Sequence, residues 1–523
     1  MPRLPIPGGD TGSWGTLINS FLNVAHHPDG TLKSTSLADI PALRVSQWST
    51  APRPDTVALT DSWSAGDGGG VFRVDPNDAT TPDDGGMVIV DAANNRWKRL
   101  LIDNCVRPEF WGADPTGGAD AAPAFIAAIA HVGAALGSPH AILLHAGGRY
   151  RIDSSLAITD RSVSIFSHGS SSVGGDYAVM RPCAILDFSA APVGTKALAV
   201  TATNPQGVFG FRLSNVDIVR TGDAKGSGGR GLYAGGMSHA VISNVAFVGF
   251  DQSFEIDGVA ATGIPAVRNS FTNVRCSGAL TQVFSLGSTY DNHFWQCIFL
   301  PAIGADRIFY VGGGAVGTIP PNANNFHGCI FVGDETNTPE LGRITSGFRH
   351  VFDDCVFEQA MLYGIVLFYA VDAPASIVNL SARNCHWDRS GVAIYNAGAY
   401  THWVVDGARV WCSTNTHGMA YDTSSAPSTY PSVSVKITNS TITVTGASAA
   451  GIFVTKSVGG ILAFNTINCD NFASGNPGIL LSGTTQKWHV VHNHTRTNYA
   501  LANGDGISDL GINNRLDNNT RAT

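Results

Sequence analysis

The sequence contains few charged residues, with only 14% Asp, Glu, Lys and Arg in 523 residues and a net charge of −8. Lysine and arginine form no cluster, so a nucleic-acid-binding surface is not expected. No apolar run approaches the length that spans a bilayer, and the start of the chain lacks the pattern of a secretory signal. We therefore expect a globular protein, made in a cytoplasm, that neither binds nucleic acid nor inserts into a membrane.

Several motifs of catalytic and metal sites are also missing. The nine cysteines include no CxxC pair, which argues against a zinc site and a disulfide framework and favours reduced, buried thiols. The glycine-rich stretch at 66–70 is not followed by GK[ST], and GxSxG does not occur, so no phosphate-binding loop or serine nucleophile is indicated. We expect no metal and no cofactor.

The residues that are present indicate a β-rich, turn-rich chain in several parts. Hydrophobic residues make up 44% of the sequence, and there are 60 glycines. We expect an extended leader over 1–45, a small β-rich head domain over 46–105, a longer repetitive region over 106–500 and a short tail over 501–523. One amphipathic helix is predicted after Asp120, with Phe125, Ile129 and Val132 on one face, where it would cap the structure that follows.

The most informative feature is an irregular repeat that begins near residue 140. A turn residue is followed by an apolar–any–apolar strand, at anchors Asn215, Asn244, Asn273, Gln296, Gly328, Asp354, Asn384, Gly407, Asn439, Asn465 and Asn493. Successive anchors lie 23–32 residues apart by subtraction, which suits one turn of a parallel β-helix. The predicted fold is all-β: a right-handed, single-stranded parallel β-helix of the pectate-lyase-like type.

Side chains alternate along a strand, so the repeat also predicts which positions point inward. Positions one and three after the anchor, and two before it, are apolar in most coils. Cys297, Cys329, Cys355 and Cys385 share the first of these positions and are expected to stack in the interior as small apolar side chains. An asparagine at the anchor suits a left-handed corner.

The outward positions are where a ligand must bind, because the interior of a β-helix is filled. One ladder, just before the anchors, reads Trp295, His327, Asp353, Arg383 and Asp406. A second, two residues after them, holds the apolar Ile298, Ile330 and Val356 and then His386. An apolar outward patch favours burial against another chain, so we expect a homotrimer.

Glu358 and Asp388 are the predicted catalytic pair. They fall on adjacent coils, about 5 Å apart at the backbone, and glycoside hydrolysis uses two carboxylates at such a separation. Trp411, one coil further, could stack on a sugar, while His386 and Arg389 could bind it. The alternative is a solvated carboxylate pair balanced by Arg389.

The first ladder offers a second candidate. Asp353 lies between His327 and Arg383 and is either a catalytic group or part of a surface ion-pair ladder. Trp295 is either a sugar platform or a trimer contact. His327 and Arg383 are expected to bind substrate in the first case.

Three stretches resemble phage tail spikes and capsule depolymerases. LPIPGGDTGSWGTLINSFLNVAHHPDGTLK is similar to the leader of many tail fibres, and SAGDGGGVFRVDPNDATTPDDGGMVIVDAANNRWKRL resembles a small head domain of spikes. RPEFWGADPTGGADAAPAFIAAIA resembles the first coil and capping helix of pectate-lyase-like proteins. The resemblance implies a homotrimer held in the virion tail by its N-terminal part, which acts on bacterial surface polysaccharide. It carries over no catalytic residue, because catalytic positions vary among spikes.

These observations predict a receptor-binding tail spike that depolymerises a bacterial surface polysaccharide, by hydrolysis rather than elimination. A lyase is permitted by the outward Arg383 and Arg389. A non-catalytic glycan-binding fibre is the alternative from another class, and a free secreted enzyme is disfavoured by the missing signal. A phage-tail-like particle would use the same leader.

Overall fold

The computed structural model describes two compact units, residues 1–151 and 152–523. Within them it describes residues 32–48, 53–63, 69–101, 103–132, 141–169, 183–204, 207–259, 263–313, 320–334, 336–367, 378–396, 401–412, 417–422, 434–445, 450–455, 458–469, 477–482, 485–497, 507–511 and 513–522, and the single residues Thr16, Ile18, Ala25 and His26. Most of the predicted leader therefore lies outside the described residues. No helix among the described residues is long and apolar enough to cross a membrane.

The first unit contains a five-stranded sheet in the order β1-β2-β3-β5-β4. Its elements are β1 (Ser34–Leu37), α2 (Ile40–Arg44), β2 (Thr56–Leu59), β3 (Gly70–Asp75), β4 (Val88–Val90) and β5 (Arg96–Arg99). β1 pairs in parallel with β2, so the sheet begins inside the segment that the sequence analysis assigned to the leader. The reason is local: alternation in the short strand β1 and the Asp39 cap of α2 are weak signals next to the surrounding turn residues.

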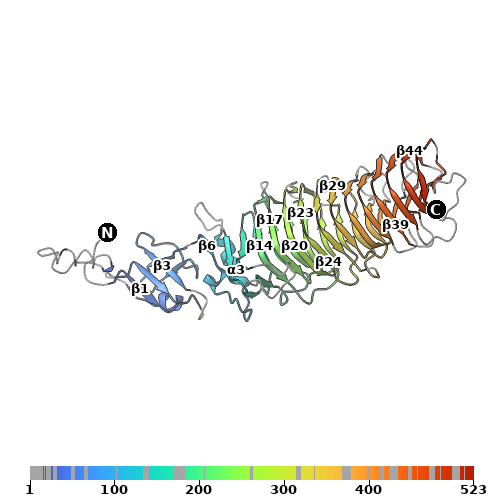
Figure 1. Ribbon diagram of the computed structural model, residues 1–523. Helices are drawn as coiled ribbons and strands as arrows, with labels where there is room; N and C mark the ends of the chain where they lie inside the picture. The colour runs from blue at the N-terminus through green and yellow to red at the C-terminus, as the bar shows by residue number, and fades with distance from the viewer. Residues whose placement is uncertain are drawn as a thin grey trace, which may run out of the picture. The chain divides into compact units, whose positions relative to one another are not determined.

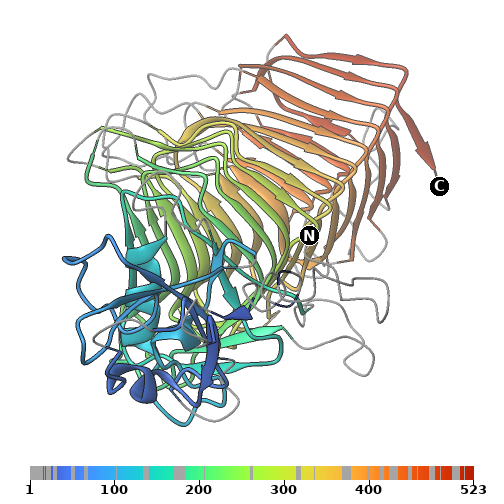
Figure 2. The same ribbon diagram turned by 90° about the vertical axis from the view of Figure 1, so that its left-hand side faces the viewer.

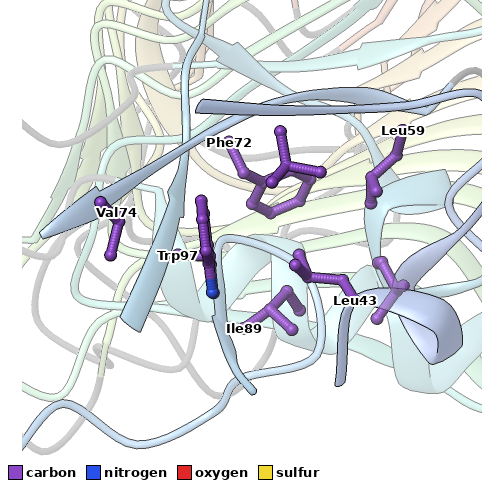
Figure 3. Close-up of a cluster of buried hydrophobic side chains, with 8 residues drawn as sticks. Leu43, Leu59, Phe72, Val74, Ile89 and Trp97 are labelled. Carbon is purple, nitrogen blue, oxygen red and sulfur yellow. The ribbon is translucent and has the colours of Figure 1, made fainter. Parts of the chain in front are cut away.

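The core of this small sheet is aromatic and aliphatic. Phe72 and Trp97 are fully buried between the sheet and α2, and Figure 3 shows both rings directed into the same cluster as Leu43, Leu59 and Ile89. Burying such side chains stabilises a domain by about 1.5–3 kcal/mol each, which explains how so short a segment holds a defined fold.

The rest of the first unit holds the predicted helix. It comprises β6 (Cys105–Val106), η1 (Pro108–Trp111), α3 (Ala122–His131), β7 (Ala141–Leu144) and β8 (Arg149–Arg151). Asp120 Oδ1 accepts a hydrogen bond of 2.9 Å from the Ala122 amide, and Phe125, Ile129 and Val132 are buried. The helix and its apolar face are confirmed, while its capping role stays a prediction.

The second unit is a parallel β-helix, which confirms the predicted fold class. In Figure 1 the strands β14, β17, β20, β24, β29, β39 and β44 follow one another in chain order, and Figure 2 shows successive strands lying one behind another. Three parallel sheets run along the stack, because each strand pairs with its counterpart in the next coil.

The three sheets contain all the described strands of the second unit, β9 to β48. The largest is built from β10 (Ser164–Ser167), β11 (Ala184–Asp187), β14 (Arg212–Val219), β17 (Val241–Val248), β20 (Ser270–Ala279), β23 (His293–Trp295), β24 (Ile298–Pro301), β26 (Asn325–His327), β27 (Ile330–Val332), β29 (Gly347–Asp353), β30 (Val356–Glu358), β32 (Val378–Arg383), β33 (His386–Ser390), β35 (Thr401–Asp406), β36 (Arg409–Cys412), β38 (Ser434–Thr438), β39 (Thr441–Val444), β41 (Val458–Ala463), β42 (Thr466–Cys469), β44 (Gln486–Val491), β45 (His494–Thr497), β47 (Arg515–Asp517) and β48 (Thr520–Ala522). The second is built from β9 (Leu156–Thr159), β12 (Lys196–Thr201), β15 (Arg230–Gly235), β18 (Gln252–Asp257), β21 (Gln282–Leu286), β25 (Arg307–Val311), β28 (Glu340–Ile344), β31 (Tyr363–Leu367), β34 (Val392–Asn396), β37 (Met419–Asp422), β40 (Ile452–Thr455), β43 (Ile479–Leu481) and β46 (Ile507–Asp509). The third is short: β13 (Val208–Phe209), β16 (Met237–Ser238), β19 (Ala266–Val267) and β22 (Thr289–Tyr290).

The interior is a set of side-chain ladders, as the repeat predicts. Phe271, Phe294, Phe326 and Phe352 stack with ring centroids 4.6–4.7 Å apart, and Trp387 stacks on Phe357 at 5.0 Å. The four cysteines of the predicted ladder are fully buried and free. Burial raises the pKa of the Cys355 and Cys385 thiols well above the usual value, which favours the inert thiol form.

A column of left-handed residues marks one corner of each described coil from Asn215 onward. It runs through Asn215, Asn244, Asn273, Gln296, Gly328, Asp354, Asn384, Gly407, Asn439, Phe464, His492 and Asn518, all with φ between 50° and 67°. The predicted anchors Asn465 and Asn493 are therefore wrong by one residue. They lie one position further on, buried inside, where asparagine was not expected to lie.

The misplaced asparagines form a polar stack of their own. Asn465 Nδ2 donates to Asn493 Oδ1 at 2.9 Å, and Asn493 Nδ2 donates to Asn519 Oδ1 at 3.0 Å. Asn519 belongs to the last coil, whose strands β46, β47 and β48 lie in the segment predicted as a tail. The coils thus continue to Ala522, held by buried amides as well as by apolar side chains such as Leu462, Val490 and Ile507.

Candidate active site

Two outward faces of the β-helix carry the candidate residues, one on each side of the left-handed column. The face that follows the column holds Glu358 on β30, Asp388 on β33 and Trp411 on β36. The face that precedes it holds Trp295, His327, Asp353 and Arg383 on β23, β26, β29 and β32.

Glu358 and Asp388 are direct neighbours in register, as the repeat predicts. Glu358 pairs with Asp388, and Asp388 pairs with Trp411 on the next coil. Adjacent strands lie about 4.8 Å apart, so the two carboxylates leave the backbone at a distance suited to a retaining pair. Both side chains are half-buried, and Trp411 is 44% exposed, so the three form an accessible row.

The backbone beneath Asp388 is firmly held. Trp387, its neighbour in β33, is fully buried and stacked on Phe357, which fixes the strand from the inside. Asp388 Oδ1 is buried and has no hydrogen-bond partner among the described residues.

A β-bulge follows the pair. The register of β33 against β36 shifts between Asp388 and Ser390, and Arg389 sits in the bulge with φ 53°. Gln359 has a left-handed φ of 61° in the preceding coil. A bulge re-aims the side chains around it and is frequent beside active sites.

Two further cationic or polar groups share this face. His386 is exposed on β33 and pairs in register with the exposed Arg409 of β36. His386 was predicted as a substrate-binding residue, whereas Arg409 was missed. Arg409 lies two residues after the corner Gly407, just as His386 lies two residues after the corner Asn384. The repeat would therefore have identified Arg409 as well.

The face that precedes the column is a connected aromatic and polar strip. Trp295 is 43% exposed and stacks on His327 with centroids 4.1 Å apart and planes 13° apart. His327 Nδ1 lies 3.6 Å from Asp353 Oδ2, and Asp353 pairs in register with Arg383. Asp353 thus has a histidine and an arginine as ladder neighbours, the arrangement expected of a surface ion-pair ladder.

Asp406 ends this strip as a structural residue. Its Oδ1 accepts hydrogen bonds from Thr438 Oγ1 at 2.7 Å and Asn439 Nδ2 at 2.8 Å. These bonds, the Thr438 hydroxyl first, lower the pKa of the Asp406 carboxyl below its usual value. A carboxylate that is held in its charged form by two such bonds is poorly suited to donate a proton near neutral pH.

The sequence analysis missed a neighbouring group on the same face. Asp291 Oδ1 lies 3.1 Å from His293 Nε2, Arg268 Nε lies 3.7 Å from Asp291 Oδ2, and the His293 ring is nearly parallel to that of Trp295. His293 lies two residues before Trp295, so alternation alone would have placed it on this face. No three His, Cys, Asp or Glu side chains come together as a metal-binding group within the described residues.

The comparison with protein families concerns the first unit. Residues 36–103 match the model of the phage tail protein small four-stranded β-sheet domain. The chain carries a phage tail domain. The match indicates a component of a phage tail, and the matched residues overlap the segment 46–105 that was predicted as a head domain.

Solved structures share the fold of the remaining chain. The catalytic unit of a thermostable GH87 α-1,3-glucanase from Streptomyces thermodiastaticus matches with a TM-score of 0.51 and 11% identity, over 83% of this chain and 75% of that one. At this identity the likeness shows a common parallel β-helix and nothing more.

Two phage tailspikes also match, at lower TM-scores. One is the enzymatically active domain of tailspike protein 2 of bacteriophage CBA120, with a TM-score of 0.39 and 15% identity, over 87% of this chain and 60% of that one. The other is the tailspike gp49 of Acinetobacter baumannii bacteriophage Fri1, a capsular polysaccharide depolymerase, with a TM-score of 0.37 and 13% identity, over 90% of this chain and 76% of that one. The chain spans less than two thirds of the CBA120 domain.

Proposed function

We propose that this chain is a tail spike that binds a bacterial surface polysaccharide and cleaves it by glycosidic hydrolysis at Glu358 and Asp388. The observation that carries the proposal is the register of β30 and β33, which sets these two half-buried carboxylates side by side on an outer face. The match of residues 36–103 to a phage tail domain supports an activity of this kind at the surface of a bacterium.

The proposed reaction proceeds in two steps, because the strand spacing suits retention. In the first step one carboxyl donates its proton to the glycosidic oxygen, while the other attacks the anomeric carbon and the bond to the leaving sugar breaks. In the second step the first group, now a carboxylate, takes a proton from water, which displaces the sugar from the enzyme. Trp411 offers a ring for stacking beside the pair, and His386, Arg389 and Arg409 offer donors to sugar oxygens.

The test is release of reducing ends from a panel of purified capsular and O-antigen polysaccharides. Glu358→Gln and Asp388→Asn are each expected to slow release by about 10²–10⁴-fold. Asp306→Asn is the matched control: this carboxylate is half-exposed and paired with Lys225 in a turn, away from the pair. It is expected to keep native activity.

The other outcomes lead to different conclusions. Full activity in both variants would contradict the assignment and move the site to Asp353. An increase in ultraviolet absorbance during the reaction, caused by an unsaturated sugar product, would indicate elimination instead of hydrolysis. Binding of a polysaccharide without cleavage by the native chain would favour the adhesion fibre.

We further propose that the spike is a homotrimer attached to other tail or baseplate proteins through its N-terminal region. Support for the trimer comes from the half-buried apolar row Ile298, Ile330 and Val356, beside Leu300 and Val332, on the face that carries the carboxylate pair. A second copy of the chain would cover this row.

A further inference from the structure

A cleft of about 480 Å³ opens beside the short third sheet. It is lined by His239, Pro265, Val267, Arg268, Tyr290 and Asp291. These residues belong to the early coils, whose left-handed corners are Asn244, Asn273 and Gln296. The cleft is therefore at least one full coil away from Glu358 and Asp388, on another face of the β-helix, and takes no part in the proposed cleavage.

The third sheet carries Val267 and Tyr290 into the lining of the cleft and continues beyond it to Phe209, whose ring packs on the lining residue His239. Phe209, Ser238, Val267 and Tyr290 pair in register on β13, β16, β19 and β22. Three coil spacings separate Phe209 from Tyr290, about 14 Å along the stack. That length accommodates a short oligosaccharide lying along the third sheet, with an aromatic ring near each end.

Phe209 is unusually open for an aromatic residue. Its side chain is 61% exposed, and its ring rests on the His239 imidazole with centroids 4.5 Å apart. An exposed ring held in one orientation by a second ring loses little freedom on binding, so it suits stacking on a sugar.

The polar groups of the cleft match sugar hydroxyls. Arg268 and Asp291 lie side by side, with 3.7 Å between Nε and Oδ2. The N–H donors of the guanidinium therefore lie next to the two acceptor oxygens of the carboxylate. His239 Nδ1 is buried and has no hydrogen-bond partner in the described part of the chain. Because the guanidinium and the carboxylate balance each other, the cleft offers no net charge to an acidic sugar.

We propose that this cleft is a second, non-catalytic polysaccharide-binding site, which holds an uncharged stretch of glycan by stacking on Phe209 and Tyr290. Vicinal hydroxyls of the glycan bind Asp291 and Arg268. The site holds the polysaccharide while another segment of the same polysaccharide binds at the carboxylate pair.

Binding and cleavage are measured separately to test this proposal. The probe is the purified polysaccharide from the panel above that the native spike binds, with affinity measured by biolayer interferometry on Glu358→Gln spikes. Phe209→Ala and Tyr290→Ala are each expected to weaken the Kd by at least about tenfold. Phe464→Ala is the matched control, because Phe464 is also exposed (59%) and also stacks on a histidine, His492, at 5.1 Å. It is expected to bind like its parent.

In the active background, Phe209→Ala and Tyr290→Ala are expected to raise KM and to leave kcat unchanged. Native affinity in both cleft variants would overturn the proposal, as would an equal loss of affinity in Phe464→Ala. A change of oligomeric size in the cleft variants would assign the cleft to contacts between copies and would overturn it too. The proposal survives if Glu358→Gln keeps native cleavage, since that result concerns only the catalytic pair.

Discussion

At the scale of single residues, the buried His350 links stability to pH. His350 lies in β29 with 1% of its surface exposed, Nε2 is 3.3 Å from the Ser346 carbonyl oxygen, and Nδ1 has no hydrogen-bond partner among the described residues. Burial lowers the pKa of the imidazole to about 4, against a partial opposing effect of the Ser346 carbonyl. The unfolded chain takes up this proton near pH 6.5 and the folded chain only near pH 4.

The β-helix is therefore expected to lose stability as the pH falls from about 6.5 toward 4, by about 2 kcal/mol at pH 5 from this residue alone. His350→Leu should reduce the difference between the unfolding midpoints at pH 7 and pH 5, since leucine takes up no proton. His494→Leu is the control, because His494 is exposed and its Nδ1 lies 2.9 Å from the Thr520 hydroxyl in the last coil. Equal midpoints of the native protein at the two pH values would contradict the prediction.

The sequence predicted the inner ladders and the neighbouring positions of Glu358 and Asp388, because side chains alternate between inward and outward positions along an unbroken strand. The cleft residues Arg268, Tyr290 and Asp291 escaped prediction for a physical reason. A second left-handed corner, with φ 54° at Arg268 and 55° at Asp291, resets the alternation before the strand that leads to the anchor. A count backwards from the anchor therefore fails to place the residues beyond it.

At the scale of structural elements, the asparagine stack holds the last coils together. Asn493 is fully buried, accepts from the Asn465 amide groups and donates to Leu462 and Asn519. Aromatic stacking holds the middle coils, whereas here amides bridge one coil to the next. The sequence analysis read these asparagines as corner residues because the preference of asparagine for left-handed corners is the stronger prior.

Asn493→Ala is expected to destabilise the β-helix by about 1–3 kcal/mol for each buried polar group that loses its partner. Thermal unfolding of the variant should begin at a lower temperature than that of the native chain. Asn468→Ala, at a half-buried outward position of β42, is the comparison and should unfold like the native chain. A native unfolding temperature for Asn493→Ala would show that the amide stack contributes nothing.

At the scale of the whole molecule, the apolar row on the carboxylate face predicts the assembly. Ile330 lies in its middle, paired in register with Ile298 and Val356. Ile330→Asp should leave the coil interior intact, because this side chain points outward, and should convert the trimer to monomers by light scattering. A control change on another sheet, Thr159→Asp at an exposed position of β9, should keep the native mass. A monomeric native chain would refute the proposed trimer.

The column of left-handed corners also bears on how such a spike changes its target. By subtraction, successive corners are separated by 23 to 32 residues, yet the strands between them pair in parallel from coil to coil, with register shifts in only three of the strand pairs of the largest sheet among the described residues. Most length differences are absorbed in the connecting loops and the rest in a few β-bulges, so residues can be added or removed there without shifting the phase of the interior ladders. The host range can then change by exchange of surface loops, one coil at a time, while the interior side chains that determine the fold stay the same.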